Sequence, residues 1–157
     1  MRKIILPLIA AIAIASCNSS DKKHDHGKTS GGNGLVDSLK ETINDLHDKG
    51  MGKMYELTKL QQDTRRIVDS LDALGPNLQG AVASYKASLD SILKDLDYAE
   101  FAMDKWMPEY YSNTDTLSDN EPERIKYLQN EIDKASKITD AILDGIKKAS
   151  VLLKTKP

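Results

Sequence analysis

The stretch IKYLQNEIDKASKITDAILDGIKKASVLL, residues 125–153, decides the fold of this chain. Its apolar residues recur at intervals of three and four, which is the spacing of one face of an α-helix. This stripe consists of Ile125, Leu128, Ile132, Ala135, Ile138, Ile142, Ile146, Ala149 and Leu152. Polar residues fill most of the positions between them, so the segment is predicted to be an amphipathic helix with one buried face.

Two earlier segments carry the same pattern. The stripe of the first consists of Leu39, Ile43, Leu46, Gly50, Met54, Leu57, Leu60, Thr64, Ile67, Leu71 and Leu74. The stripe of the second consists of Leu78, Val82, Tyr85, Leu89, Ile92, Leu96, Ala99, Met103 and Trp106. No stretch alternates with the period of two that a half-buried strand would show, so the chain is predicted to be all-α.

Turn signals separate the three segments. Gly75-Pro76-Asn77 is predicted to end the first helix and to turn the chain. Pro108 disfavours the helical conformation at Met107, so the second helix is predicted to end there. Asn120, followed by Pro122 in the first turn, opens the third helix.

We therefore predict an up-down-up antiparallel three-helix bundle, coiled-coil-like, within residues 35–157. Its helices are expected over residues 35–74, 78–107 and 121–154. The polar residues 108–121 are expected to form a loop that carries Tyr110 and Tyr111.

The N-terminal residues 1–16 have the pattern of an export signal. Arg2 and Lys3 precede an apolar run that is too short to span a membrane as a mature helix. The residues directly before Cys17, Ile-Ala-Ser, resemble a bacterial lipobox, which implies cleavage before the cysteine and acylation of it. Cys17 is the only cysteine of the chain, so we expect a lipid anchor in the cell envelope and no disulfide.

Residues 17–34 are predicted to be a lipidated cysteine and a flexible tether, because they are polar and rich in glycine and serine. An aspartate after the cysteine would resemble an inner-membrane retention signal, and Asn18 therefore favours the outer membrane. His24 and His26 are a weaker candidate site for zinc, nickel or copper(II). A floppy segment does not preorganise such a site, and solvated linker residues are the simpler interpretation.

The net charge of the chain is −2, and it becomes −4 when Arg2 and Lys3 leave with the signal. This small acidic balance argues against binding of nucleic acid by bulk charge. The expected partners are instead the membrane, through the lipid anchor, and a protein partner or a second copy of the chain.

Methionine is concentrated in two short motifs, HDKGMGKMYEL (47–57) and AEFAMDKWMPEY (99–110). If the hairpin turns near residue 76, His47 lies level with Trp106, and Met51 lies level with Met103. All four methionines after the initiator would then lie in one slab of the bundle, together with the only tryptophan.

Thioethers and a neutral imidazole are ligands that suit a soft ion of low charge, Cu(I) or Ag(I). The candidate ligands are His47, Met51, Met54, Met103 and Met107. The ring of Trp106 is a candidate cap over the ion through a cation–π contact. A set without carboxylates or thiolates disfavours zinc and calcium.

The same residues also suit a plain hydrophobic core. Methionine fills irregular gaps and packs well against tryptophan. His47 would then form a hydrogen bond with Asp48 or Tyr127. Gly50 and Gly52 would make room for the Trp106 ring, or would let the helix deform around a ligand.

No catalytic motif is visible: the chain has no glycine-rich phosphate loop, no G-x-S-x-G and no H-E-x-x-H. Asp and Glu stand next to lysines, as in KDLD (94–97) and NEIDK (130–134), which is typical of solvated helix faces. We therefore predict that the protein is not an enzyme.

The lipobox together with HDKGMGKMYELTKL (47–60) and AEFAMDKWM (99–107) resembles a family of small Bacteroidota lipoproteins. Its members are often labelled viral A-type inclusion proteins. The resemblance implies an envelope location and a helical fold, and it leaves the function open.

Two hypotheses follow from different classes of protein. The first is an envelope lipoprotein that holds Cu(I) or Ag(I) between its first two helices. The second is a structural or adaptor lipoprotein that binds a partner helix or itself, in which the methionine cluster is core.

Overall fold

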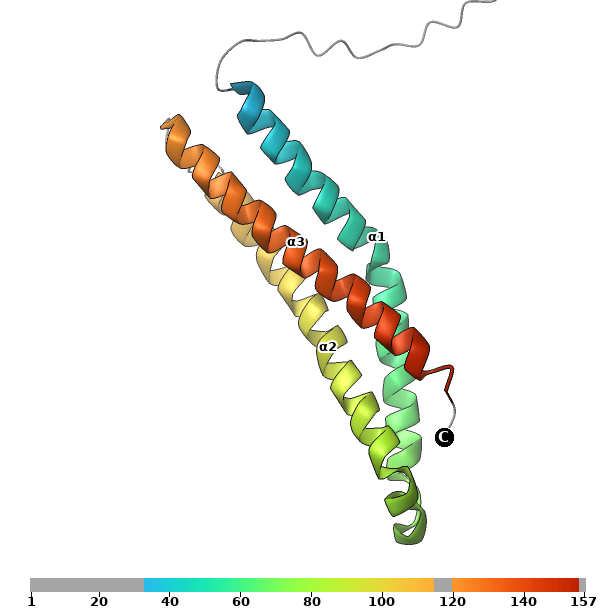
Figure 1. Ribbon diagram of the computed structural model, residues 1–157. Helices are drawn as coiled ribbons and strands as arrows, with labels where there is room; N and C mark the ends of the chain where they lie inside the picture. Colours follow the sequence, from blue (N-terminus) through green and yellow to red (C-terminus); the bar gives the residue numbers. More distant parts are fainter. Residues whose placement is uncertain (1–32, 115–119, 156–157) are drawn as a thin grey trace, which may run out of the picture.

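The computed structural model describes residues 33–114 and 120–155, and it forms three antiparallel helices (Figure 1). They are α1 (Asn33–Asp72), α2 (Pro76–Thr114) and α3 (Glu121–Leu152). Each helix packs against both others, which confirms the predicted all-α up-down-up bundle. None of the described helices is long and apolar enough to cross a membrane. The predicted signal, the lipidation site Cys17 and the candidate pair His24 and His26 lie outside the described residues.

The turn between α1 and α2 lies where Gly75-Pro76-Asn77 predicts it. Pro76 is the first residue of α2, a position where the missing N–H of proline costs no helical hydrogen bond. The amide of Leu78 donates to the carbonyl of Gly75 at 2.9 Å and closes the first turn of α2. The predicted boundaries of the first and third helices are within two residues of those observed.

The predicted end of the second helix is wrong, because α2 continues through Pro108 to Thr114. A proline inside a helix removes one backbone hydrogen bond and crowds the preceding turn. Here the turn beyond it is held by packing, since Tyr110 is only 5% exposed and stacks on Trp106. Tyr110 and Tyr111 therefore lie on a helix and not in a loop.

The core is a single apolar column between the three helices. Its fully buried apolar side chains include Ile43, Leu57, Leu96, Met103, Leu128 and Ile142. Four polar or charged residues also lie in it: Gln61, Thr64, Glu131 and Thr139. The hydroxyl of Thr139 donates to the carbonyl of Leu46 at 2.9 Å and so joins α3 to α1.

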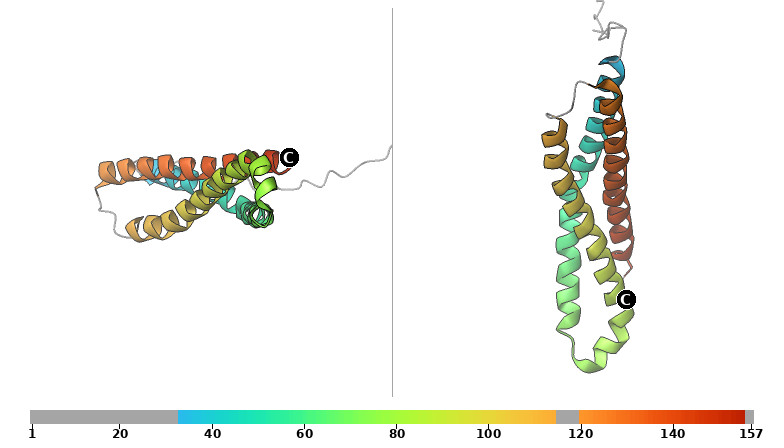
Figure 2. Two further views of the ribbon diagram at one scale, coloured as in Figure 1. Left: turned by 90° about the horizontal axis from the view of Figure 1, so that it is seen from below. Right: turned by 90° about the vertical axis from the view of Figure 1, so that its left-hand side faces the viewer.

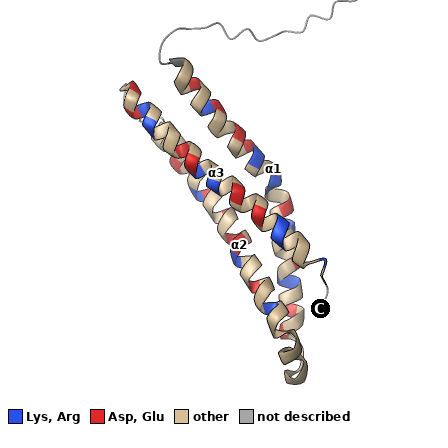
Figure 3. Cartoon of the chain, viewed as in Figure 1, with Lys and Arg blue, Asp and Glu red and all other residues tan. Residues whose placement is uncertain are grey.

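The hairpin of α1 and α2 extends beyond the C-terminal end of α3 (Figures 1 and 2). No stripe residue from Ile67 to Tyr85 is buried, and Leu78 is 57% exposed. The other stripe residues in this part are partly buried, because α3 does not reach this end of the hairpin. From Ala73 to Tyr85 the chain has no charged residue, and Figure 3 shows an uncharged tip.

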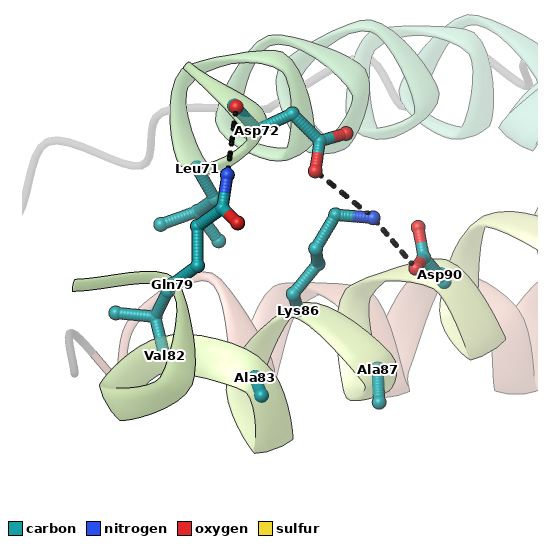
Figure 4. Close-up of a pocket in the computed structure, with 8 residues that line it drawn as sticks. All are labelled: Leu71, Asp72, Gln79, Val82, Ala83, Lys86, Ala87 and Asp90. Atoms are coloured by element: carbon teal, nitrogen blue, oxygen red, sulfur yellow. Dashed lines mark hydrogen bonds and ion pairs between the residues drawn. The ribbon is translucent and has the colours of Figure 1, made fainter. Parts of the chain in front are cut away.

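Polar contacts hold this tip together (Figure 4). The side-chain amide of Gln79 donates to the carbonyl of Leu74 at 2.9 Å and to that of Asp72 at 3.3 Å. Asp72 is the last residue of α1 and Leu74 lies two residues beyond it, where carbonyls lack helical partners, so Gln79 serves as a cap. The ammonium group of Lys86 pairs with Asp72 at 3.3 Å and with Asp90 at 3.1 Å.

Candidate functional site

His47 and Trp106 face each other across α1 and α2. Their ring centroids are 6.3 Å apart, and the ring planes are tilted by 42°. The predicted register of the hairpin is thereby confirmed at this level. Trp106 is only 5% exposed, so the ring lies inside the bundle and not at its rim.

Met103 lies one turn along α2 and fills the space beside Gly50. A Cβ atom built on Gly50 would lie 2.6 Å from Cε of Met103 and 3.4 Å from Oγ1 of Thr139. The absence of a side chain at position 50 therefore makes room for the Met103 thioether, and not for the Trp106 ring as the sequence suggested. Met103 itself is fully buried between α1 and α3.

The two ring nitrogens of His47 have different surroundings. Nδ1 lies 3.0 Å from Oδ1 of Asp48, which confirms the neighbour expected from the sequence. Nε2 is buried and has no hydrogen-bond partner among the described residues. A neutral imidazole that donates from Nδ1 to a carboxylate carries its lone pair on Nε2, so the atom that faces the interior is the one able to bind a cation.

The remaining methionines lie around this pair at different depths. Met54 and Met107 are partly buried and pack against the core. Met51 is 39% exposed, so it lies at the outer edge of the slab. Met103 and Trp106 therefore lie inside the bundle, and His47, Met54 and Met107 are partly buried.

Glu131 is a buried residue that the sequence pattern did not reveal. Its placement on a solvated face is wrong, because its side chain is only 3% exposed and accepts a hydrogen bond of 2.8 Å from the indole N–H of Trp106. Its other oxygen pairs with the ammonium group of Lys134 at 2.7 Å. A signal was present, since Glu131 lies three residues after Leu128 and four before Ala135, both on the apolar stripe.

Two tyrosines adjoin this buried hydrogen bond. The Tyr110 ring stacks on Trp106 with centroids 5.4 Å apart and planes tilted by 20°. Burial raises the pKa of Tyr110 above its ordinary value of 10.0. Burial is also the largest cause that raises the pKa of Tyr127, and the nearby charge of Glu131 adds to it.

The donors of this site are chemically soft. Among the described residues, no group of three or more His, Cys, Asp or Glu side chains could hold a metal ion. An ion held here would instead take one imidazole nitrogen and thioether sulfurs, which is a ligand set for a monovalent soft cation.

Comparison with protein-family models, curated proteins and solved structures finds no match to this chain.

Proposed function

We propose that this chain is a non-enzymatic, lipid-anchored protein of the cell envelope that binds Cu(I) or Ag(I) between α1 and α2. The observation that carries the proposal is the buried Nε2 atom of His47, which has no hydrogen-bond partner among the described residues. A buried polar atom without a partner costs about 1–3 kcal/mol, and coordination of a cation removes that cost.

The neighbours of this nitrogen support a soft ion. On the facing helix, Met103 lies one turn before Trp106 and is fully buried, and Met107 directly follows Trp106 and is partly buried. We assign His47, Met103 and Met107 as the inner ligand set. Met54 is a partly buried reserve, and Met51 is an outer candidate because of its exposure.

Trp106 completes the site as a cap. Aromatic faces attract cations within about 6 Å of the ring centroid. The carboxylate of Glu131 accepts a hydrogen bond from the indole N–H, which raises the electron density of the ring and favours this contact. The same hydrogen bond fixes the orientation of the ring before any ion arrives.

The envelope location rests on the sequence, in which an export signal and a lipobox-like stretch precede Cys17. Thioether ligands suit the binding of a soft metal ion in the cell envelope. They bind without releasing a proton, and they do not form disulfides as thiols do in an oxidising compartment.

A titration with Ag(I) tests the proposal. The protein would lack residues 1–16 and carry Cys17→Ser, His24→Asn and His26→Asn, which remove competing ligands near the N-terminus. Binding at the proposed site quenches the fluorescence of Trp106 and raises the melting temperature. The combination of Met103→Leu and Met107→Leu abolishes both responses, although such swaps nearly conserve side-chain volume.

A second candidate is a structural lipoprotein in which the same residues are plain core. The observation that favours it is the 2.8 Å hydrogen bond from Trp106 to Glu131, which orders the ring without any ligand. Under this alternative, Ag(I) at micromolar concentration changes neither the fluorescence nor the melting temperature. The titration therefore separates the two.

A further inference from the structure

A groove of about 380 Å³ runs between α2 and α3 on the surface of the bundle. Tyr98 belongs both to this groove and to a smaller depression of about 190 Å³ next to it. Together they form one continuous face, which we call the α2/α3 face. It includes positions from Asp95 to Glu109 on α2 and from Lys134 to Lys148 on α3.

The centre of the α2/α3 face is apolar and exposed. Tyr98 and Phe101 are 64% and 61% exposed, which is unusual for two aromatic rings one helical turn apart. Beside them the floor consists of small side chains, Ala102 on α2 and Ala141 on α3. Because these alanine side chains are small, another helix can approach closely and pack against the aromatic rings.

The two ends of the α2/α3 face carry opposite charge. Three lysines and one acid, Lys105, Lys134, Lys137 and Glu109, line the end toward the C-terminus of α2. The other end has Asp95 and Asp144 with one cation, Lys148.

Some of these charges are already balanced within the chain. Lys134 pairs with Glu131 at 2.7 Å, and Lys148 pairs with Asp95 at 3.2 Å. Lys105, Lys137 and Asp144 make no ion pair with other described residues.

We propose that the α2/α3 face binds a second copy of this chain around a two-fold axis. The axis passes between Tyr98 and Phe101, lies in the plane of the interface and runs perpendicular to the helices. Such an axis sets the basic end of one copy against the acidic end of the other, twice. The aromatic rings of both copies meet at the centre, and α2 and α3 of each copy then form a four-helix contact.

The size of the face predicts a weak dimer. From position 95 to position 109, α2 rises by about 21 Å, and two adjacent helices are about 20 Å wide. Each copy would bury about 400 Å², which is about half of what a standard stable interface buries. A membrane anchor raises the effective concentration of the two copies, so weak association suffices there.

Charge reversal tests this arrangement by sedimentation equilibrium. One variant, Lys105→Glu with Lys137→Glu, has acidic charge at both ends of its face. The other, Asp95→Lys with Asp144→Lys, has basic charge at both ends. We expect dimers for the natural chain, monomers for each variant alone, and a one-to-one heterodimer when the two variants are mixed.

Two further variants control for unrelated effects. Phe101→Ser removes a ring from the centre and is expected to weaken the dimer at least tenfold. Tyr55→Ser removes a ring on α1 that is 84% exposed, and is expected to leave the dimer unchanged. Circular dichroism checks that every variant remains helical.

The proposal is overturned if the natural chain remains monomeric at several hundred micromolar. It is equally overturned if the mixed variants stay monomeric while the natural chain dimerises, since a two-fold contact of this charge pattern requires their pairing. Met103→Leu leaves this dimer intact, so failure of the metal proposal and failure of the dimer are distinguishable.

Discussion

The indole N–H of Trp106 on α2 donates a 2.8 Å hydrogen bond to the carboxylate of Glu131 on α3, and both residues are buried. This bond joins α2 to α3 through a buried polar contact between Trp106 and Glu131, which we call the junction. It orients the ring that lies 6.3 Å from the His47 ring and stacks on Tyr110.

The junction predicts unequal effects at position 131. Glu131→Leu leaves the indole N–H buried without an acceptor and is expected to lower the free energy of unfolding by about 2–3 kcal/mol. Glu131→Gln keeps an acceptor and is expected to cost about 1 kcal/mol. Urea denaturation followed by circular dichroism measures both. The neighbouring exposed residue provides the control, since Asp133→Asn is expected to change stability by less than about 0.5 kcal/mol. Equal costs for the two Glu131 variants would contradict the junction.

The two central glycines of α1 predict unequal outcomes for the same substitution. A Cβ on Gly52 meets nothing within 4 Å, so Gly52→Ala is expected to stabilise the helix by about 0.5–1 kcal/mol. At Gly50 the same atom would displace Met103, and most of that gain is expected to be lost. Thermal melts of the two variants measure the difference. If Gly50→Ala stabilises as much as Gly52→Ala, then Met103 is not packed against position 50.

Stability is expected to fall above pH 10. Burial raises the pKa of Tyr110 and Tyr127, and the hydrogen bond to Glu131 raises the pKa of Lys134. The folded state therefore keeps protons that the unfolded chain releases from about pH 10 upward. The contribution of these groups is fully present below that pH and is lost as the pH rises through their folded values. Urea denaturation at pH 8, 10 and 11 measures the decline, and Tyr110→Phe with Tyr127→Phe is expected to make it shallower. A decline of unchanged steepness in that variant would assign it to other groups.

The proposed lipid anchor predicts that Cys17 is the site of modification. Cells grown with an alkyne-bearing fatty acid are expected to label the natural chain, and Cys17→Ser is expected to abolish the label and release the protein from the membrane fraction. Ser16→Ala, next to the site, serves as the matched control and is expected to keep both. Membrane retention of Cys17→Ser without label would show that another segment attaches the chain.

The sequence was sufficient to predict the three helices, the turn between the first two and the pairing of His47 with Trp106. Stripes at intervals of three and four, with Gly75 and Pro76 between two of them, place His47 level with Trp106, and the rings are indeed 6.3 Å apart. These signals are local, and a hairpin with a short turn has only one register.

The failures come from tertiary contacts. Pro108 ends an isolated helix, but stacking of Tyr110 on Trp106 holds the next turn in place. Glu131 stands beside lysine as surface residues do, yet its partner is an indole N–H on another helix. The depth of each methionine also depends on packing, so the sequence did not separate buried Met103 from Met51 at the edge.

Nuclear magnetic resonance of the isotope-labelled protein tests most directly the central claim that His47, Met103 and Met107 bind a soft metal ion. Long-range proton–nitrogen spectra report each ring nitrogen of His47, and methyl-labelled methionine reports each thioether. On addition of one equivalent of Ag(I), we predict a shift of the His47 Nε2 resonance, retention of the proton on Nδ1, and shifts of the Met103 and Met107 methyl groups that exceed that of Met51. An unchanged Nε2 resonance at saturating Ag(I) would contradict the account and would leave these residues as core.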